Sequence, residues 1–294
     1  RGNAKYITTT GSREYYTPDA FTFGDEELSG IWVGKFETSS SDPSANYGGG
    51  NTTELDPMIK PNINSWRYIS VSNAFNVSLK MNDAGNRYGF NESTDTHMMK
   101  NSEWAIVAYL SQSKYGKLGN TNFTGANKEI YQNKSNYFIT GCSYGSPSNG
   151  NTDYGCQYQY NEEIKGTGAS TTGNIYGIYD MSGSAWEYVM GNYNDVVGAS
   201  GFESPLTLNS KYYDKYTSSN ANTSCNGNEC LSHGLSETIE WYNDKHTMIN
   251  NEQPWIGRGG HYSLPYVGIF YNASIGYMGD AEGGGTFRLV ATIK

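Results

Sequence analysis

The stretch GNIYGIYDMSGSAWEYVMGN, residues 173–192, is the segment around which we expect the rest of the chain to be organised. Its aromatic and aliphatic residues are interrupted by small residues, a pattern too irregular for a helix and too apolar for an exposed loop. We therefore predict buried turn structure. A tight turn at residues 182–184 would bring the carboxylates of Asp180 and Glu187 close to backbone carbonyls. Oxygen groups of this kind are the ligands that calcium takes.

The composition favours one large, loop-rich domain over residues 1–294. Only 17% of residues are charged, whereas the chain has 36 Gly and 26 Tyr, which suits a hydrogen-bonding surface better than a helical bundle. Six Trp and 26 Tyr argue against disorder. The net charge of −9, without basic clusters, argues against nucleic acid and anionic membranes as partners.

The four cysteines form two close pairs, Cys142 with Cys156 and Cys225 with Cys230, within polar loops. This spacing predicts two local disulfides, of which the first would contribute ~3 kcal/mol by closing its loop. Zinc binding by Cys225 and Cys230 is the alternative. It would need a further pair of closely spaced cysteines, which the sequence lacks, and His233 alone does not complete a ligand set. Disulfides would place the chain outside the cytoplasm.

No apolar run approaches the ~20 residues that a membrane-spanning helix needs. Arg1 leads directly into polar sequence. We therefore expect a soluble ectodomain without membrane insertion, whose signal or anchor was removed or lay upstream.

Apolar alternation in residues 30–37 (GIWVGKFE) predicts a first strand. The Ser, Gly and Asn of residues 38–56 then predict a surface insertion. Helical spacing of apolar residues in residues 71–85 predicts a helix. Ser72 is its expected N-cap, and Gly85 is expected to end it.

Residues 96–116 predict the clearest helix, with Asn101 or Ser102 as its cap and Gly116 at its end. A catalytic acid or base is one interpretation of His97 or Glu103. Capping and the helix dipole explain these two residues more simply.

Near the end of the chain, Arg258 lies in WIGRGG and Arg288 in FRLV. Each guanidinium can bind carboxylates or carbonyls as a fork, while the glycines allow strands to approach closely. We therefore interpret both arginines as structural rather than substrate-binding.

The central stretch resembles the signature of the formylglycine-generating-enzyme (sulfatase-modifying factor) family, a branch of the C-type-lectin-like fold. The resemblance covers GIYDMSGSAWEY at residues 177–188, with Ser184 where the family has Asn. Residues 103–108 and the two closing motifs resemble further family segments, with Thr286 where the family has Gly. The resemblance implies an α+β, C-type-lectin-like domain that is loop-rich, with short strands and a few helices.

Oxidase members of that family carry a copper-binding cysteine pair between the two closing motifs. Residues 261–286 of this chain contain no cysteine. Tyr or Ser cannot replace a thiolate as a ligand of copper(I). We therefore expect no redox cofactor and no enzyme activity, but a binding protein on an enzyme-like scaffold.

The same interval is rich in Tyr, Asn, Ser and Gly, the residues that antibody binding sites use. It resembles the variable proteins of diversity-generating retroelements, bacterial and phage proteins that diversify this segment for ligand binding. The resemblance implies a variable ligand-binding segment at residues 255–288. The expected ligand-binding residues are His261, Tyr262, Ser263, Tyr266, Tyr271, Asn272, Tyr277 and Asp280.

Other residues of the interval are expected to have different roles. Val267 and Phe270 are predicted to lie in the core. Diversification of Asn codons cannot produce Met278 or Glu282, so either these two belong to a constant framework or the resemblance ends at the fold.

The family resemblance also implies a structural calcium site. Its ligands would be the side chains of Asp180 and Glu187 and the carbonyls of Gly183 and Ala185. A second family site is expected to be lost, because Ala169 stands where an Asp is needed. The alternative for Glu187 is an ion pair with Arg258 or Arg288.

These expectations favour an extracellular or cell-surface adhesin or receptor-binding module of a bacterium, or of a phage tail tip. Its ligand would be a protein or glycan on another cell or surface. The alternative is an extracellular metal-dependent oxidase with His97, His233, His246 and His261 as ligands, although their four unlike contexts disfavour it. A third interpretation is a pilus or cell-wall subunit that associates with itself.

Overall fold

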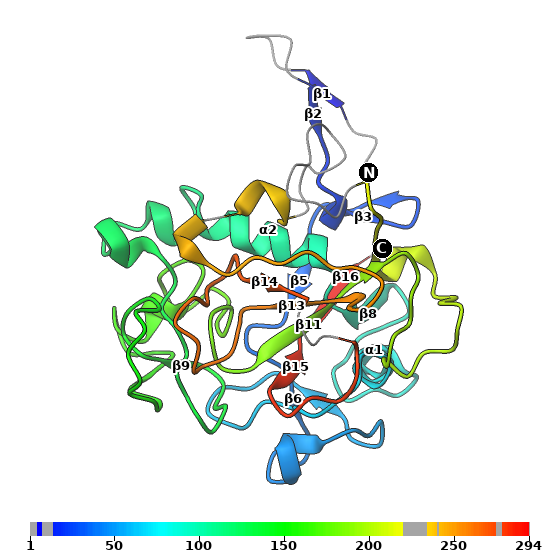
Figure 1. Ribbon diagram of the computed structural model, residues 1–294, viewed down its shortest axis with the longest axis horizontal. Helices are drawn as coiled ribbons and strands as arrows, with labels where there is room; N and C mark the ends of the chain where they lie inside the picture. The colour runs from blue at the N-terminus through cyan, green and yellow to red at the C-terminus, as the bar shows by residue number, and fades with distance from the viewer. Residues whose placement is uncertain (1–4, 8–13, 220–233, 240, 275–277, 294) are drawn as a thin grey trace.

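The strand β11 (Trp186–Tyr193) lies at the centre of the largest sheet (Figure 1). It comes from the second half of the stretch that we predicted to form buried turns, so that prediction is wrong for these residues. All but the last of its residues are buried. A strand covered on both faces lacks the alternation of apolar and polar residues that reveals a strand in sequence. The residues that precede it form turns and bends, as predicted, but they are not all buried, because Asn174 and Tyr176 are exposed.

The computed structural model describes residues 5–7, 14–219, 234–239, 241–274 and 278–293. Within these ranges the protein is an α+β structure of short strands and loops with two α-helices, as expected at that level. The strands β12 (Asp214–Tyr216) and β15 (Gly285–Phe287) pair parallel to β11, while β13 (Trp255–Arg258) pairs antiparallel. β14 (Asn272–Ala273) continues the sheet beyond β13.

A second, three-stranded sheet joins the beginning of the chain to its end. β16 (Leu289–Ile293) lies between β5 (Trp32–Val33) and β8 (Thr94–Met98), antiparallel to both. The single residue Arg288 links β15 of the first sheet to β16 of the second. The guanidinium of Arg288 also bonds Glu187 in β11 and the carbonyl of Gly34, the residue after β5, so it connects the two sheets.

The remaining strands form small antiparallel pairs: β1 (Lys5–Ile7) with β2 (Glu14–Tyr16), β3 (Thr22–Phe23) with β4 (Glu26–Glu27), β6 (Ser39–Ser40) with β7 (Pro57–Met58), and β9 (Cys142–Ser143) with β10 (Tyr158–Gln159). Short 3-10 helices lie at Asp19–Phe21, Asn46–Gly49, Lys80–Asn82, Lys117–Gly119, Gly125–Lys128, Thr167–Ala169, Ser210–Tyr212, Ser236–Thr238 and Trp241–Asn243. Figure 1 shows β1 and β2 projecting from the rest of the molecule.

The expected first strand is shorter than predicted, because only Trp32 and Val33 form it. The predicted surface insertion of residues 38–56 is wrong at its beginning. Thr38, Ser39 and Ser40 are fully buried, and the last two pair with β7. The hydroxyl of Ser40 is satisfied there because it donates a hydrogen bond to the carbonyl of Gly48.

The two α-helices exist where helical spacing predicted them, but their ends differ. α1 (Val71–Leu79) is capped by Ser70, whose hydroxyl accepts a hydrogen bond from the N–H of Asn73, and not by Ser72. The helix ends before Gly85, because the chain tightens into 3-10 geometry at Lys80–Asn82. Packing against β8 buries the side of α1 that carries Ala74 and Phe75.

α2 (Asn101–Ser111) begins later and ends earlier than the predicted 96–116. The preceding residues form β8, which is buried along its whole length and therefore shows no alternation. Asn101 and Ser102 are helical residues rather than caps. Glu103 closes the first turn by accepting the N–H of Lys100 at 2.7 Å, which confirms its capping role.

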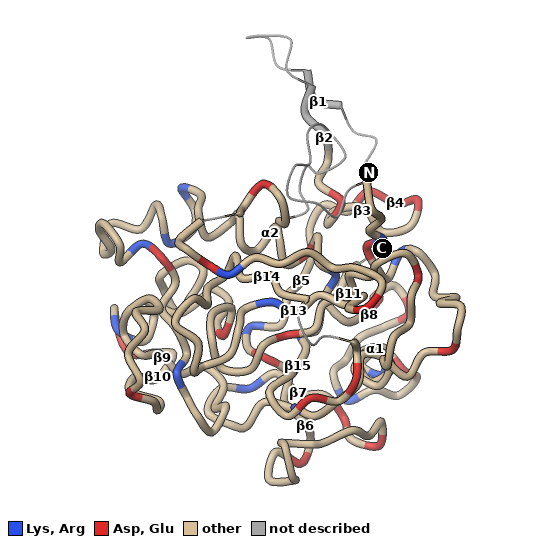
Figure 2. Tube along the Cα trace, viewed as in Figure 1, with Lys and Arg blue, Asp and Glu red and all other residues tan. Residues whose placement is uncertain are grey.

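Val267 and Phe270 are buried in the hydrophobic core, as predicted. None of the helices in the described residues has both the length and the apolar character that a membrane-spanning helix requires. Charged residues of both signs recur along the chain (Figure 2).

Candidate ligand-binding surface

The predicted ligand-binding residues are divided between the surface and the interior of the protein. Tyr266 is 37% exposed, Ser263 is exposed, and His261 and Tyr262 are partly buried. Asp280, near the end of the segment, is also partly buried. These five residues lie at or near the surface, as a ligand-binding role requires. Tyr277 lies outside the described residues.

Tyr271 and Asn272 are only 2% and 1% exposed, so their predicted display on the surface is wrong. Asn272 belongs to β14 and pairs with Arg258 in β13. Its side-chain amide donates a hydrogen bond to the carbonyl of Thr247 at 2.8 Å. The chain turns inward here to complete the central sheet, which composition alone does not reveal.

His261 and Tyr262 meet aromatic residues from two other parts of the chain. The ring of Tyr262 lies 5.2 Å from that of Phe138 and 5.3 Å from that of Tyr154. The imidazole of His261 lies 5.4 Å from the ring of Phe138. We call the resulting set the aromatic surface; its members are Tyr47, Arg67, Tyr68, Phe138, Tyr154, His261 and Tyr262.

Arg67 joins the two halves of the aromatic surface. Its guanidinium carbon lies 3.8 Å from the ring centre of Phe138 and 5.4 Å from that of Tyr47, and the ring of Tyr47 stacks on Tyr68 at 4.8 Å. Cation–π contacts of this kind each contribute about 0.5–2 kcal/mol. Burial lowers the pKa of Arg67, while Glu37, Tyr47 and Tyr262 act in the opposite direction.

Hydrogen bonds attach this arginine to the C-terminal segment. Nη1 of Arg67 donates to the carbonyl of Gly283, and the N–H of Tyr68 donates to the carbonyl of Glu282 at 3.1 Å. Within the described residues, Nε of Arg67 is buried and has no hydrogen-bond partner. The guanidinium is therefore positioned mainly by aromatic rings, and its hydrogen-bonding capacity is only partly used.

Three aromatic residues of this surface have left-handed backbone geometry. The φ angles of Tyr47, Tyr68 and Phe138 are 57°, 56° and 55°. Bulky residues rarely adopt these angles, and each such residue costs about 1–3 kcal/mol. Strain of this kind persists only where surrounding contacts impose it, and it is concentrated at functional sites.

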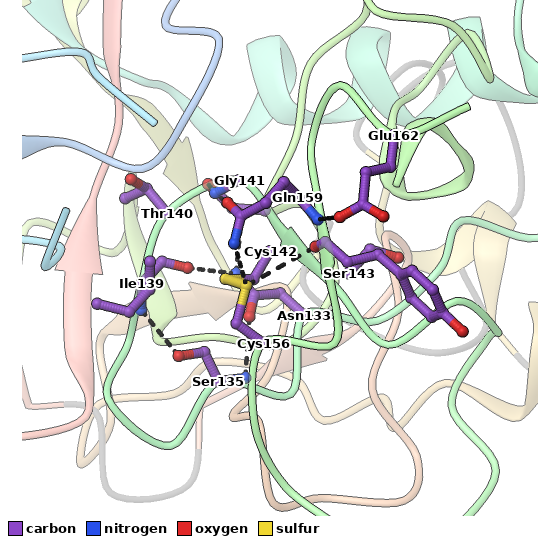
Figure 3. The surroundings of a disulfide bond; sticks show 12 residues. Asn133, Ser135, Ile139, Thr140, Gly141, Cys142, Ser143, Cys156, Gln159 and Glu162 are labelled. Carbon is purple, nitrogen blue, oxygen red and sulfur yellow. Dashed lines mark hydrogen bonds between the residues drawn. A yellow bond between two sulfur atoms is a disulfide. The ribbon is translucent and has the colours of Figure 1, made fainter. Parts of the chain in front are cut away.

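The predicted disulfide between Cys142 and Cys156 is confirmed, with Cα atoms 5.1 Å apart (Figure 3). It closes the loop that presents Tyr154 to Tyr262. The side chain of Gln132 donates hydrogen bonds to the carbonyls of Tyr262 at 3.0 Å and Leu264 at 3.3 Å. The loop and the exposed C-terminal residues thus form one supported unit. Cys225 and Cys230 lie outside the described residues.

The residues of the predicted calcium site lie in the interior. Glu187 forms an ion pair with Arg288, whose Nε lies 3.0 Å from the carboxylate, so the alternative pairing with Arg288 is the observed one. Asp180 accepts hydrogen bonds from the side-chain amide of Asn133 and the N–H of Gly141, both at 2.9 Å. The N–H of Gly183 donates to the carbonyl of Gly259 at 2.9 Å.

A third carboxylate, Glu37, completes this interior and was not foreseen as part of it. It accepts hydrogen bonds from the hydroxyl of Ser184 at 3.0 Å and from the N–H of Ala185 at 3.1 Å. Burial raises the pKa of Glu37, and the neighbouring Asp180 and Glu187 raise it further. Calcium binding through Asp180, Glu187, Gly183 and Ala185 stays a prediction. No group of three or more His, Cys, Asp or Glu in the described residues is arranged to hold a metal ion.

The histidines proposed for the oxidase alternative lie in different surroundings. His97 is fully buried, with its two ring nitrogens 3.1 Å from Asp95 and 3.0 Å from Glu103. Burial lowers the pKa of His97, but the two carboxylates outweigh it and the net shift is upward. Burial lowers the pKa values of His246 and His261 to about 4. His233 lies outside the described residues.

Arg258 and Arg288 are structural, as interpreted from the sequence, and neither is more than 1% exposed. The guanidinium of Arg258 donates to the side chain of Asn101 at 2.9 Å and to the carbonyl of Gly234 at 2.6 Å. It thereby connects β13 to α2 and to the chain that leads into Ser236–Thr238.

No protein-family model matches this chain, and no curated protein matches it.

Proposed function

We propose that this protein is a non-enzymatic, extracellular ligand-binding protein that presents its aromatic surface on a C-type-lectin-like scaffold of the formylglycine-generating-enzyme type. Its ligand is a protein or glycan on another cell or surface. The sequence resemblance to the variable proteins of diversity-generating retroelements supports this class of function. The residues His261, Tyr262, Ser263 and Tyr266, which lie at or near the surface, correspond to the diversified part of such a protein.

The observation that carries the proposal is the convergence of partly exposed aromatic rings around Arg67. Tyr68 and Tyr154 are 42% and 43% exposed, although each ring has an aromatic neighbour. Aromatic side chains offer a large contact area at a low entropy cost, and Tyr and Arg are enriched among the residues that dominate binding energy. A rigid platform of this kind suits recognition better than catalysis.

The primary test is the sequence of the same gene from several isolates. Substitutions should be confined to the exposed part of residues 255–288, above all His261, Tyr262, Ser263 and Tyr266. Val267, Phe270, Tyr271 and Asn272 should stay constant, because they are buried in the core or the central sheet. Substitutions spread evenly along the chain, or a segment identical in all isolates, would contradict the variable-receptor proposal.

Binding itself can be tested with the purified protein on a glycan array and on a panel of bacterial surface proteins. Tyr262→Ala should reduce binding to any ligand found by about tenfold or more, because central aromatic residues dominate such interfaces. Tyr176→Ala is the matched control, since Tyr176 is 88% exposed and is not part of the aromatic surface. Equal losses in both variants would argue against this surface, and self-association alone would favour a structural subunit.

A further inference from the structure

Two adjoining hollows lie beside the three-stranded sheet, and neither includes a residue of the aromatic surface. The smaller one, of about 90 Å³, is lined by Trp32, Phe90, Leu289 and Val290 among others. The larger one, of about 460 Å³, is lined by Lys60, Arg87 and Tyr88 among others. Ile59 and Met81 line both, so we treat the two hollows as one feature, the groove.

One end of the groove is apolar. Its floor is β16, where Val290 pairs with Val33 and Ala291 pairs with Trp32. Met81 and Phe90, which follow α1, close it on another side. The indole of Trp32 is 70% exposed, unusually high for so large an apolar side chain. A ligand lying in the groove would cover part of this ring.

The other end of the groove is cationic, although the whole chain has a net charge of −9. Nη1 of Arg87 lies 3.4 Å from the carboxylate of Asp56, an exposed pair that contributes little to stability. Lys60 is exposed and forms no ion pair within the described residues. The phenol of Tyr88 donates a hydrogen bond to the carbonyl of Pro57, so its proton is not free to bind a ligand.

We propose that the groove binds a small anionic amphiphile, a medium-chain alkyl carboxylate, with its tail along Met81 and Phe90 and its carboxylate at Lys60 and Arg87. The charge complementarity selects an anionic head group over a cationic one. The size selects a small molecule, because the larger hollow of about 460 Å³ falls in the range of about 300–1,000 Å³ typical of small-molecule sites. This site is independent of the proposed ligand-binding surface.

The probe for this site is decanoate, used below its micelle concentration and followed by isothermal titration calorimetry on the whole chain. Acetate provides the head group alone, and decylamine provides the same tail with the opposite charge. Decanoate should bind, while acetate and decylamine should bind at least about tenfold more weakly, since a charge-assisted hydrogen bond and tail burial are both required.

Four variants, one of them a control, locate the binding. Lys60→Glu and Arg87→Glu should each weaken decanoate by about tenfold, since each replaces an attraction with a repulsion. Lys114→Glu is the matched control, because Lys114 is exposed and outside the groove, and it should leave the affinity unchanged. Decanoate should also shield tryptophan fluorescence from acrylamide in the wild type, and this shielding should disappear in Trp32→Phe.

Several results would overturn the proposal. These are no decanoate binding, equal binding of decylamine, or equal effects of Lys60→Glu and Lys114→Glu. Shielding that persists in Trp32→Phe would place the ligand elsewhere. Because Trp32, Lys60 and Lys114 are all exposed, their variants should fold, and circular dichroism provides the check.

Discussion

Two arginines mark the two contrasting regions of this protein. Arg288 is fully buried, and its guanidinium is shared between the carboxylate of Glu187 and the carbonyls of Gly34 and Tyr179, at 2.8 Å and 3.0 Å. Arg67 lies at the surface against aromatic rings, with one carbonyl partner and an Nε that has none in the described residues. The first arginine stabilises the junction of the two sheets, whereas the second holds aromatic rings together at the surface.

The largest difference between the two regions should appear in stability. Arg288→Met should lower the free energy of unfolding by about 3–5 kcal/mol, because it leaves Glu187 buried without its partner. Arg67→Met should lower it by only about 0.5–2 kcal/mol, the value of its cation–π contacts. Urea denaturation measures both. Equal losses would mean that Arg67 is as structural as Arg288.

The disulfide between Cys142 and Cys156 stabilises the loop that contributes Tyr154 to the aromatic surface. Replacing Cys142 and Cys156 together with Ser should lower the free energy of unfolding by ~3 kcal/mol, because the open loop gains entropy in the unfolded chain. Ligand binding should weaken as well, since this loop carries Tyr154. A double variant with wild-type stability and binding would show that the loop is held by its other contacts.

The two parts of the C-terminal segment should respond differently to the same substitution. Tyr271→Leu should cost about 1–3 kcal/mol of unfolding free energy, because it changes the shape of a buried side chain. Tyr266→Leu, at an exposed position, should stay within about 0.5 kcal/mol of the wild type. Thermal unfolding followed by circular dichroism gives both values. A larger loss of unfolding free energy in Tyr266→Leu than in Tyr271→Leu would contradict the assignment of Tyr266 to the surface and Tyr271 to the core.

The interior should also respond to pH through Glu37. Its pKa in the folded protein is raised above the ordinary value of 4.5, mainly by burial, so the folded state holds this proton more tightly than the unfolded state. The resulting stability is fully present below the unfolded pKa and is lost as pH rises toward the folded one.

The change that tests this is Glu37→Gln, which imitates the protonated carboxyl group. Relative to this variant, the wild type should lose up to about 1.4 kcal/mol of unfolding free energy per pH unit as the pH rises from the ordinary pKa of 4.5 toward the raised pKa of the folded protein. Urea denaturation across that range measures the difference. A pH-independent difference would show that Glu37 is ionised in the folded protein.

Local features of the sequence predicted a substantial part of the interior. The positions of α1 and α2, the core residues Val267 and Phe270, the capping role of Glu103 and the disulfide between Cys142 and Cys156 all follow from spacing and residue type. Each depends on neighbours within about one turn or one loop. Interactions between residues that are close in the chain can therefore be predicted from a single sequence.

The strands β8 and β11 were not predicted, because sheets and helices cover them on both sides and leave no alternating pattern. Most of the aromatic surface was also missed. Tyr47, Arg67, Tyr68, Phe138 and Tyr154 stand in loops whose composition resembles that of the other polar loops. Their left-handed geometry and their proximity to Tyr262 appear only in three dimensions.

By itself, the sequence determined that this chain folds into a loop-rich α+β structure with a local disulfide and two structural arginines. The tertiary structure alone decided which tyrosines reach the surface, because the chain turns inward after Tyr266 to complete β14. Burial depends on contacts between residues far apart in the chain. A residue's own type and its immediate neighbours cannot specify those contacts.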